Sequence, residues 1–400
     1  MSLKKIEKPF FSIVIPTRDR AFLLEGLINS IINQDFQDFE IIVADNSTDN
    51  LSQIFLADLK ENNCIRNIRT GGLNMADNWD LAINAISGKF LLLFSDKMIL
   101  KQGSLKFLKE FINTNNPDCV TWNIDAFIDQ DSTYFDKSTQ LNNRTISSED
   151  LLKFILKSDM ISFDSSAFHC NSAISCEVIQ NIKSKTGRVC MQLNPDYTMS
   201  YQVLMNIDKI HLIGDSLSVM RYEDQDNGYG NGSSFMKKTS QASNFMKDNN
   251  DWVEKMKTFK DVPITGNHFV LDLILKDLYS IMRLYEVNPD HIISKNIRTS
   301  YYYFFTLNEI YWRISMGIDM KQELDLWKSS LQNESKEIKV LAKKLIKRIM
   351  LKKFRILLVQ FCKKSYFISP FLNFIRNIIN TNKGTKYISI EDFYNNEIIK

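Results

Sequence analysis

Three mostly apolar stretches in the first hundred positions each stop abruptly at a cluster of polar residues. They are Phe10–Ile15, Phe39–Ala44 and Phe90–Phe94. Short continuous apolar runs with polar boundaries are typical of strands that are buried on both faces of a parallel sheet. The pattern therefore predicts three such strands, each followed by a polar loop.

Amphipathic helices are predicted between these strands. Ala21–Asn33 carries its leucines and isoleucines three and four residues apart, and Leu51–Leu59 and Asn74–Ile86 also have helical patterns. Strands that alternate with helices favour right-handed βαβ units with parallel strands. The predicted fold class of the amino-terminal half is α/β, with a mostly parallel, Rossmann-like sheet, and a helical region follows it.

The loops after the predicted strands gather at one edge of the sheet, where ligands of open α/β sheets bind. They deliver Thr17–Arg20, Asp45 and Asp96 to this edge. Basic and hydroxyl side chains suit phosphates, and a carboxylate such as Asp45 can accept hydrogen bonds from a base or a ribose. Asp45 and Asp49 could instead form an Asx turn and a helix cap. We favour that interpretation for Asp49 and the functional one for Asp45.

The middle of the chain adds a strand, a loop and one further carboxylate. Cys119–Ile124 is predicted as a strand, and Asp125–Asn143, which is polar with little periodicity, as a surface loop. Asp196 follows Pro195 at a predicted helix start, where its carboxylate could accept a proton from an attacking hydroxyl. The alternative is an ordinary acidic residue in the first turn of a helix.

Long helical patterns dominate the carboxyl-terminal half. Ser300–Ile314 is strongly aromatic, which at helical spacing indicates core packing. Residues 336–376 hold twelve Lys or Arg and one acid, a local charge of +11 in a chain of net charge +3. Basic residues interspersed with aliphatic ones are typical of helices that lie in an anionic membrane surface. A partner helix or a polyphosphate is the alternative, and nucleic acid is disfavoured because no recognised binding motif accompanies the charge.

Composition is that of a globular protein, with 44% hydrophobic and 24% charged residues. The chain shows neither a signal-peptide pattern nor an apolar run long enough to span a bilayer, so we expect a cytoplasmic protein, peripheral at the inner face of the membrane. The six cysteines lack metal-binding spacing and are expected to be reduced thiols. The predicted domains are 1–232, the helical region 233–334 and the basic amphipathic tail 335–400.

The opening of this chain resembles that of family 2 glycosyltransferases. Residues 11–50, FSIVIPTRDRAFLLEGLINSIINQDFQDFEIIVADNSTDN, combine an apolar strand, Pro-Thr, a polar loop with a basic residue, a helix with a late Gln, and a strand closing on Asp. Gly72, Ala76 and Asn78 match the family pattern N-x-G-x-x-x-A-x-N, with Thr70 in place of its first Asn, and 87–90 match its small-Gly-x-[YF] pattern. The resemblance covers roughly residues 9–225 and implies a GT-A fold.

Carried over by position, the resemblance implies roles for ten residues. Asp96 would bind the metal and Asp196 would be the catalytic base. The nucleotide-sugar would be bound by eight further residues: Pro16, Thr17, Asp19, Arg20, Asp45, Asn78, Ser95 and Lys97.

The sequence departs from the family at its acidic cluster. The family usually has D-x-D or D-D-D, whereas this chain has Ser95-Asp96-Lys97. Asp96 alone could hold Mg²⁺ or Mn²⁺ together with the diphosphate and water, because Mg²⁺ commonly uses only one or two protein carboxylates. Alternatively, Lys97 could supply part of the positive charge that the metal otherwise gives. The third alternative is an inactive site.

The predicted function is transfer of a sugar from a nucleotide-diphosphate donor to a hydroxyl of a glycan or lipid-linked acceptor, with inversion, in surface polysaccharide biosynthesis. The alternative is a noncatalytic GT-A scaffold held at the membrane surface. A dinucleotide oxidoreductase is disfavoured because the first strand–helix turn lacks G-x-G-x-x-G. A sugar nucleotidyltransferase is disfavoured because Pro16–Arg20 contains no glycine.

Overall fold

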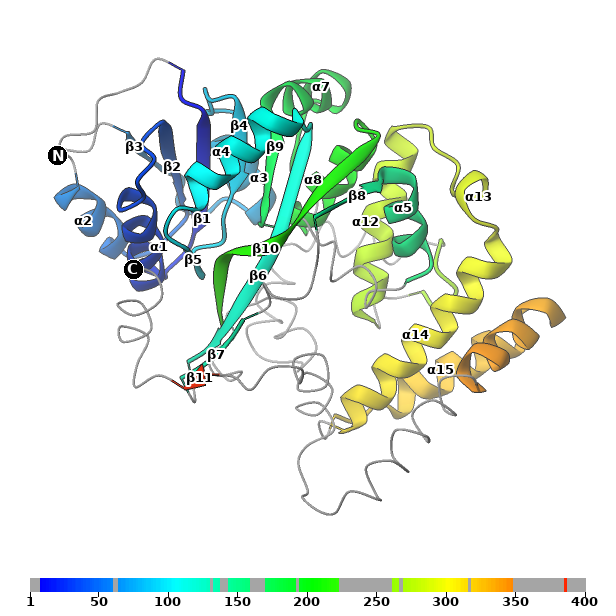
Figure 1. Ribbon diagram of the computed structural model, residues 1–400. Helices are drawn as coiled ribbons and strands as arrows, with labels where there is room; N and C mark the ends of the chain where they lie inside the picture. Colours follow the sequence, from blue (N-terminus) through cyan, green and yellow to red (C-terminus); the bar gives the residue numbers. More distant parts are fainter. Residues whose placement is uncertain are drawn as a thin grey trace. The chain divides into compact units, whose positions relative to one another are not determined.

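The computed structural model forms two compact units, and each is described by itself (Figure 1). Unit 1 comprises residues 1–150, 164–229 and 382–400, and unit 2 comprises residues 151–163 and 230–381. The structure describes residues 8–59, 64–129, 132–136, 143–158, 170–191, 194–222, 261–265, 269–315, 318–347 and 385–386. The domain boundary predicted at 232 lies outside these ranges, as does the basic tail beyond 347 except for residues 385–386.

Unit 1 is a sheet with helices against it. Its strands are β1 Phe11–Thr17, β2 Phe39–Asp45, β3 Ile65–Arg69, β4 Phe90–Leu93, β5 Met98–Leu100, β6 Cys119–Ile128, β7 Thr133–Phe135, β8 Arg144–Ser147, β9 Ser172–Ser175, β10 Lys209–Tyr222 and β11 Thr385–Lys386. Its helices are α1 Ala21–Ile32, α2 Leu51–Asp58, α3 Met75–Ile83, α4 Ser104–Asn115, α7 Cys176–Thr186 and α8 Pro195–Leu204, and α5 Ser148–Leu156 begins in unit 1 and continues into unit 2.

The parallel strands β4, β1, β2 and β3 lie side by side, and their carboxyl ends form the edge at which the sequence analysis expects a ligand. In the β1–β2 register Thr17 lies opposite Asp45, and in the β2–β3 register Asp45 lies opposite Arg69. All seven residues of β1 are buried. The predicted strands and the α/β fold class are confirmed, because short, mostly apolar runs fit a sheet covered on both faces.

Antiparallel strands extend the sheet beyond β4. The long strand β10 pairs with β5 and β8 in antiparallel fashion and with β6 in parallel fashion. The surface loop predicted at 125–143 is wrong in part, since β6 continues to Ile128 and β7 spans Thr133–Phe135. Asp125 is polar yet buried there, and it receives a hydrogen bond from Tyr134 and an ion pair from Lys101. These partners make a charged residue compatible with a buried strand.

Gly88 permits a close contact at the start of β4. A Cβ atom at this position would come within 2.8 Å of the Ser12 backbone nitrogen. The Gly88 N–H instead donates to Ser12 Oγ at 2.8 Å, and Ser12 Oγ donates to Glu40 at 2.6 Å. This junction explains the small-Gly pattern that precedes the strand in the sequence.

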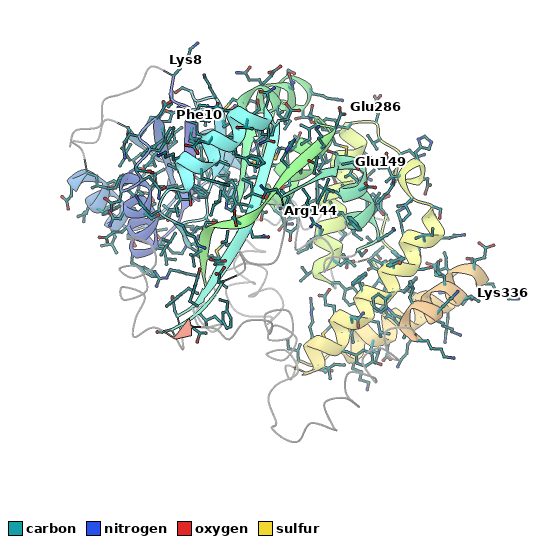
Figure 2. The ribbon with its side chains drawn as sticks, viewed as in Figure 1. Lys8, Phe10, Arg144, Glu149, Glu286 and Lys336 are labelled. Carbon is teal, nitrogen blue, oxygen red and sulfur yellow. The ribbon has the colours of Figure 1, made fainter. Side chains whose placement is uncertain are left out.

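Unit 2 is helical. Its helices are α12 Val270–Leu284, α13 Pro289–Ile292, α14 Lys295–Ser315 and α15 Lys321–Gln332, and residues 336–347 form a further helical stretch that begins at Lys336, labelled in Figure 2. Tyr302, Tyr303 and Phe304 on α14 are buried, which supports core packing of the aromatic stretch. Trp327 of α15 donates to the carbonyl of Tyr303 at 2.9 Å, and this bond helps to hold α15 against α14.

Candidate active site

Asp96 lies at the centre of the predicted edge, in the turn between β4 and β5. Its carboxylate is buried, and its Oδ2 accepts a hydrogen bond from Thr17 Oγ1 at 2.8 Å and lies 3.0 Å from Arg20 Nε. Thr17 ends β1, and Arg20 directly precedes α1, so both partners come from the first strand–helix loop. The structure therefore joins three predicted site residues in one cluster.

The surroundings of Asp96 oppose its negative charge. Burial raises the pKa of the Asp96 carboxyl above its ordinary value, although Arg20, the Thr17 hydroxyl and Lys97 each act to lower it. Its second oxygen, Oδ1, is buried and has no hydrogen-bond partner among the described residues. A buried, unsatisfied carboxylate oxygen is costly, and it is where a cation or a donor group of a ligand would be favoured.

Asp45 lies at the tip of β2 and is fully buried. Its Oδ1 accepts the Ser47 N–H at 3.0 Å, which is the Asx-turn contact raised as the alternative to a functional role. Its Oδ2 lies 3.2 Å from Arg69 Nη1 at the end of β3. Asp49, for which a turn or cap was favoured, accepts the Leu51 N–H at 3.0 Å at the start of α2.

Arg69 lies beside Asp45 in the candidate site, and the sequence analysis did not name it. Its side chain is 25% exposed, and besides Asp45 it donates to the carbonyls of Ser47 and Asp49 at 3.0 Å and 2.6 Å. Its position at the end of the third parallel strand is the sequence feature that could have identified it. The short segment Ile65–Arg69 holds only two apolar residues, so its last residue does not stand out as the end of a buried apolar run.

Asp19 connects the first two loops of the edge. Its backbone has a φ of 55°, in the left-handed region. Its N–H donates to Ser47 Oγ at 2.9 Å, and its Oδ1 accepts the Thr48 N–H at 2.6 Å. The left-handed backbone permits this crosslink between the β1–α1 and β2–α2 loops, so Asp19 shapes the edge.

Asn78 points inward and not toward the open edge. Its Oδ1 accepts from Thr70 Oγ1 at 2.7 Å, and its Nδ2 donates to the carbonyl of Ala44 at 3.1 Å. The side chain is buried and links α3 to β2. Thr70 stands in place of the first Asn of the family pattern, and its hydroxyl still bonds to Asn78, the last Asn of that pattern.

The remaining residues of the predicted nucleotide-sugar site flank this cluster. Pro16 is buried in β1 opposite Ala44, and Ser95 and Lys97 on either side of Asp96 are half-buried. The Lys97 N–H contacts Ser95 Oγ at 3.4 Å, and the Lys97 carbonyl accepts from the Arg221 N–H at 3.0 Å. The loop that carries Asp96 is therefore tied to β10.

Asp196 is brought toward the same region, near Cys170. Burial raises the pKa of the Cys170 thiol most strongly, and the negative charges of Asp196 and Asp96 raise it further while Lys97 lowers it. Asp96, Lys97 and Asp196 thus all act electrostatically on this one buried sulfur, which also receives a backbone hydrogen bond from Ser95. The sequence does not single out Cys170, because Asp96, Lys97 and Asp196 are distant from it in the chain and come near it only in the folded structure.

The helix that carries Asp196 is held by a polar network. Asp80 on α3 accepts the N–H groups of Val189 and Cys190 at 2.8 Å and 3.1 Å. Gln202 on α8 donates to the carbonyls of Arg188 and Val189 at 3.0 Å and 2.8 Å. The segment 188–190 therefore links α3, which also carries Asn78, to α8.

Metal binding by protein side chains alone has little support in this part of the chain. Across the described ranges, no three His, Cys, Asp or Glu side chains cluster in a way that could hold a metal ion. Asp96 offers one unpartnered oxygen, so a Mg²⁺ or Mn²⁺ ion would fit here only if most of its ligands came from the substrate and water.

Comparison with known proteins identifies the family of this part of the chain. Residues 12–177 match the family model described as glycosyl transferase family 2. A GalNAc(5)-diNAcBac-PP-undecaprenol beta-1,3-glucosyltransferase of Campylobacter jejuni is 33% identical over 108 residues, which are 26% of this chain and 35% of that protein. Glycosyltransferase GlyG of Streptococcus pneumoniae is 25% identical over 128 residues, 31% of this chain and 42% of that protein. The chain thus spans about 35% and 42% of the lengths of these two curated relatives.

Solved structures show a weaker likeness. The structure of residues 1–349 of TarS from S. aureus in complex with UDP-GlcNAc is 14% identical, with a TM-score of 0.47, over 76% of this chain and 89% of that one. The family match begins in β1, includes Asp45 and Asp96, and ends at the start of α7. The described elements in that range have the α/β order that the resemblance predicts. Residues 12–177 of this chain are therefore similar to glycosyl transferase family 2.

Proposed function

We propose that this chain is a nucleotide-sugar-dependent glycosyltransferase that transfers a sugar, with inversion, to a hydroxyl of a glycan or lipid-linked acceptor in surface polysaccharide synthesis. The observation that carries the proposal is the cluster of Asp96, Thr17 and Arg20 at the ligand-binding edge of a family 2 domain. The names of the relatives support the acceptor class, since one of them is a glucosyltransferase for an undecaprenol-linked glycan.

The nucleotide part of the donor is assigned to the β2 and β3 ends. Each oxygen of the Asp45 carboxylate makes one described contact, so each keeps a lone pair for a base or ribose donor. Arg69 beside it balances its charge and can contact the ribose or a phosphate. Asp19 and Asn78 act by holding the surrounding loops in place.

The diphosphate is assigned to the first loop and the Asp96 turn. Arg20 and Lys97 bring positive charge there, and Asp96 orients the Arg20 guanidinium. The Asp96 Oδ1 atom is the one oxygen that we assign to Mg²⁺ or Mn²⁺; a bound ion would supply charge neutralisation at the leaving diphosphate. Positive groups at this position stabilise the charge that develops as the diphosphate leaves.

Asp196 is assigned the role of general base. As the acceptor oxygen attacks the anomeric carbon, Asp196 takes the proton of the acceptor hydroxyl. The new carbon–oxygen bond forms while the bond from the anomeric carbon to the diphosphate breaks, and the nucleoside diphosphate departs with the electron pair. Asp196 lies in the first turn of α8, and its Oδ1 accepts the Tyr197 N–H at 2.9 Å, which leaves Oδ2 for the acceptor.

The Asp196→Asn variant tests this assignment. It should bind donor as the wild type does, because Asp196 is not placed in the diphosphate or nucleotide contacts, and it should lose transfer to the acceptor. Donor affinity is measured by calorimetry and transfer by release of nucleoside diphosphate. Transfer at a near-normal rate by Asp196→Asn would contradict the assignment.

A noncatalytic scaffold is the second candidate, and one observation favours it. The single carboxylate left in the Ser95-Asp96-Lys97 turn is already engaged by Arg20 and Thr17. A scaffold of this kind would bind no nucleotide-sugar, whereas the transferase must bind one.

Association with an anionic membrane surface through residues 336–376 is the remaining part of the proposal, together with a location at the inner face of the cell membrane. In the described stretch 336–347, Ile338 and Ala342 are buried on one face, while Lys343, Lys344 and Lys347 are exposed. Among the described residues, no helix is long and apolar enough to cross a bilayer. Flotation with anionic liposomes tests the proposal: a truncation after Ser335 should no longer bind, and continued binding would exclude this segment as the anchor.

A further inference from the structure

Unit 2 contains a cavity of about 380 Å³ that the family 2 domain does not explain. One wall is a face of α12, with Leu275, Tyr279, Met282 and Arg283. The opposite wall is a face of α14, with Lys295, Arg298, Thr299 and Tyr302. Both sets have the three- and four-residue spacing of a single helix face, so the cavity is a groove between two helices.

Apolar side chains line one part of the cavity, and polar side chains line the rest. Leu275, Met282 and Val262 line it and are only 3%, 1% and 3% exposed. The volume lies near the lower end of the range for small-molecule sites, about 300–1,000 Å³. The apolar part of this lining suits the first carbons of a hydrocarbon chain.

The cavity lining holds three cationic and two acidic side chains, a net charge of +1. Arg283 lies 2.5 Å from Asp261, and Arg298 lies 2.6 Å from Asp290, so two of the three cations face a carboxylate that also lines the cavity. Lys295, the third, is exposed and makes no ion pair within the described ranges. The surplus charge therefore sits where solvent reaches the cavity.

Two further groups point to an anion beside Lys295. The Thr299 side chain is 8% exposed and lines the cavity, yet its hydroxyl makes no hydrogen bond to any residue in the described part of the chain. Arg298 makes three hydrogen bonds, to Ile293, Tyr279 and Asp290, although a guanidinium carries five N–H donors. These residues occupy the first turns of the 21-residue helix α14, whose first turn contains no acid and whose dipole favours an anion.

We propose that this groove binds the phosphate and the adjoining chain of an isoprenyl phosphate. Lys295, the Thr299 hydroxyl and the remaining Arg298 donors would hold the phosphate, and the apolar part of the lining would hold the first part of the chain. The inference deepens the proposed function and rests on it in one respect, since it assigns this ligand as the lipid-phosphate portion of the acceptor. Neither an inorganic phosphate nor a neutral lipid satisfies both ends of the groove.

Calorimetric titration of the full chain with farnesyl phosphate, below its micelle concentration, tests the inference. Farnesol and inorganic phosphate are titrated in parallel to separate the two ends of the ligand. Lys295→Ala and Thr299→Val remove the two uncommitted polar groups, and Lys321→Ala, an exposed lysine on α15 outside the cavity, is the matched control. Loss of one charge-assisted hydrogen bond should weaken binding about tenfold or more.

The inference predicts that farnesyl phosphate binds more tightly than either farnesol or phosphate, and that Lys295→Ala and Thr299→Val, but not Lys321→Ala, weaken it. Equal affinity for farnesol, or unchanged affinity in both cavity variants, would overturn it. Titration of nucleotide-sugars into the same preparation separates this result from the proposed function. Farnesyl phosphate binding in a chain that binds no donor would leave the lipid-phosphate site standing and refute the transferase.

Discussion

The buried Asp96–Arg20 pair makes a prediction about stability that can be worked from its geometry. Arg20→Gln leaves the Asp96 carboxylate buried without its cation, with only Thr17 still donating. Removing one partner of a buried ion pair costs about 3–5 kcal/mol; because the Arg20 side chain is 27% exposed, we expect about 2–4 kcal/mol at pH 8. The Arg20→Gln, Asp96→Asn double variant should recover most of that loss, since no uncompensated charge is left.

The pH dependence of the loss follows from the direction of the pKa. Burial raises the pKa of Asp96, and Arg20 opposes that rise, so removal of Arg20 should raise the pKa further. A raised carboxyl pKa contributes stability that is present below the unfolded-state pKa and lost as pH rises through the folded-state pKa. The Arg20→Gln penalty should therefore be small near pH 4 and largest near pH 8.

Urea unfolding followed by circular dichroism, for the wild type, both single variants and the double variant at pH 5 and pH 8, measures this cycle. The predicted result is a coupling energy that grows with pH. Additive effects of the two substitutions, or an Arg20→Gln penalty that does not depend on pH, would refute the idea that Arg20 compensates a buried charge at Asp96.

Two further predictions concern other buried carboxylates. Asp80→Asn should lower kcat about tenfold with little change in donor affinity, because the hydrogen bonds from Val189 and Cys190 to the Asp80 carboxylate are worth about 1.5–3 kcal/mol each. Asp77→Asn is the matched control. It should change kcat little, because its partner Arg188 is 43% exposed. A fall in donor affinity equal to the fall in kcat would show that Asp80 does not act through Asp196. Burial raises the pKa of Asp272 to about 7. The free energy of unfolding of unit 2 should therefore fall as the pH rises from about 4 to about 7, by at most about 4 kcal/mol. Asp272→Asn should flatten that dependence in calorimetric melting curves, and an unchanged pH profile would contradict it.

The framework of unit 1 was predictable because its signals are local. Each run is short, mostly apolar and closed by polar residues, which is typical of a parallel strand that is covered on both faces. The edge residues Thr17, Arg20, Asp45 and Asp96 followed from the rule that parallel strands end on the same side. Their positions along the edge are as expected, while their roles as ligand-binding residues stay proposals.

The contacts between those residues could not be predicted, because they depend on side-chain partners that are distant in the sequence. Arg20 pairs with Asp96 across 76 positions of the chain, and nothing in either local pattern signals that pair. Asp80 has the pattern of an exposed helix acid, yet it accepts two N–H groups of a segment more than a hundred residues away. The error at Asp125 has the same cause, since Lys101 and Tyr134 make a buried charge tolerable.

The most direct test of the transferase is a calorimetric titration with UDP-, GDP- and dTDP-sugars, each in the presence of Mn²⁺ and of EDTA. The transferase proposal predicts that one donor class binds, and that Arg69→Ala and Arg20→Gln weaken it while Asp196→Asn does not. Tighter binding with Mn²⁺ would assign Asp96 to the metal, and binding that survives EDTA would assign the diphosphate to Arg20 and Lys97. Absence of binding for every donor, with and without Mn²⁺, would contradict the transferase and favour the scaffold.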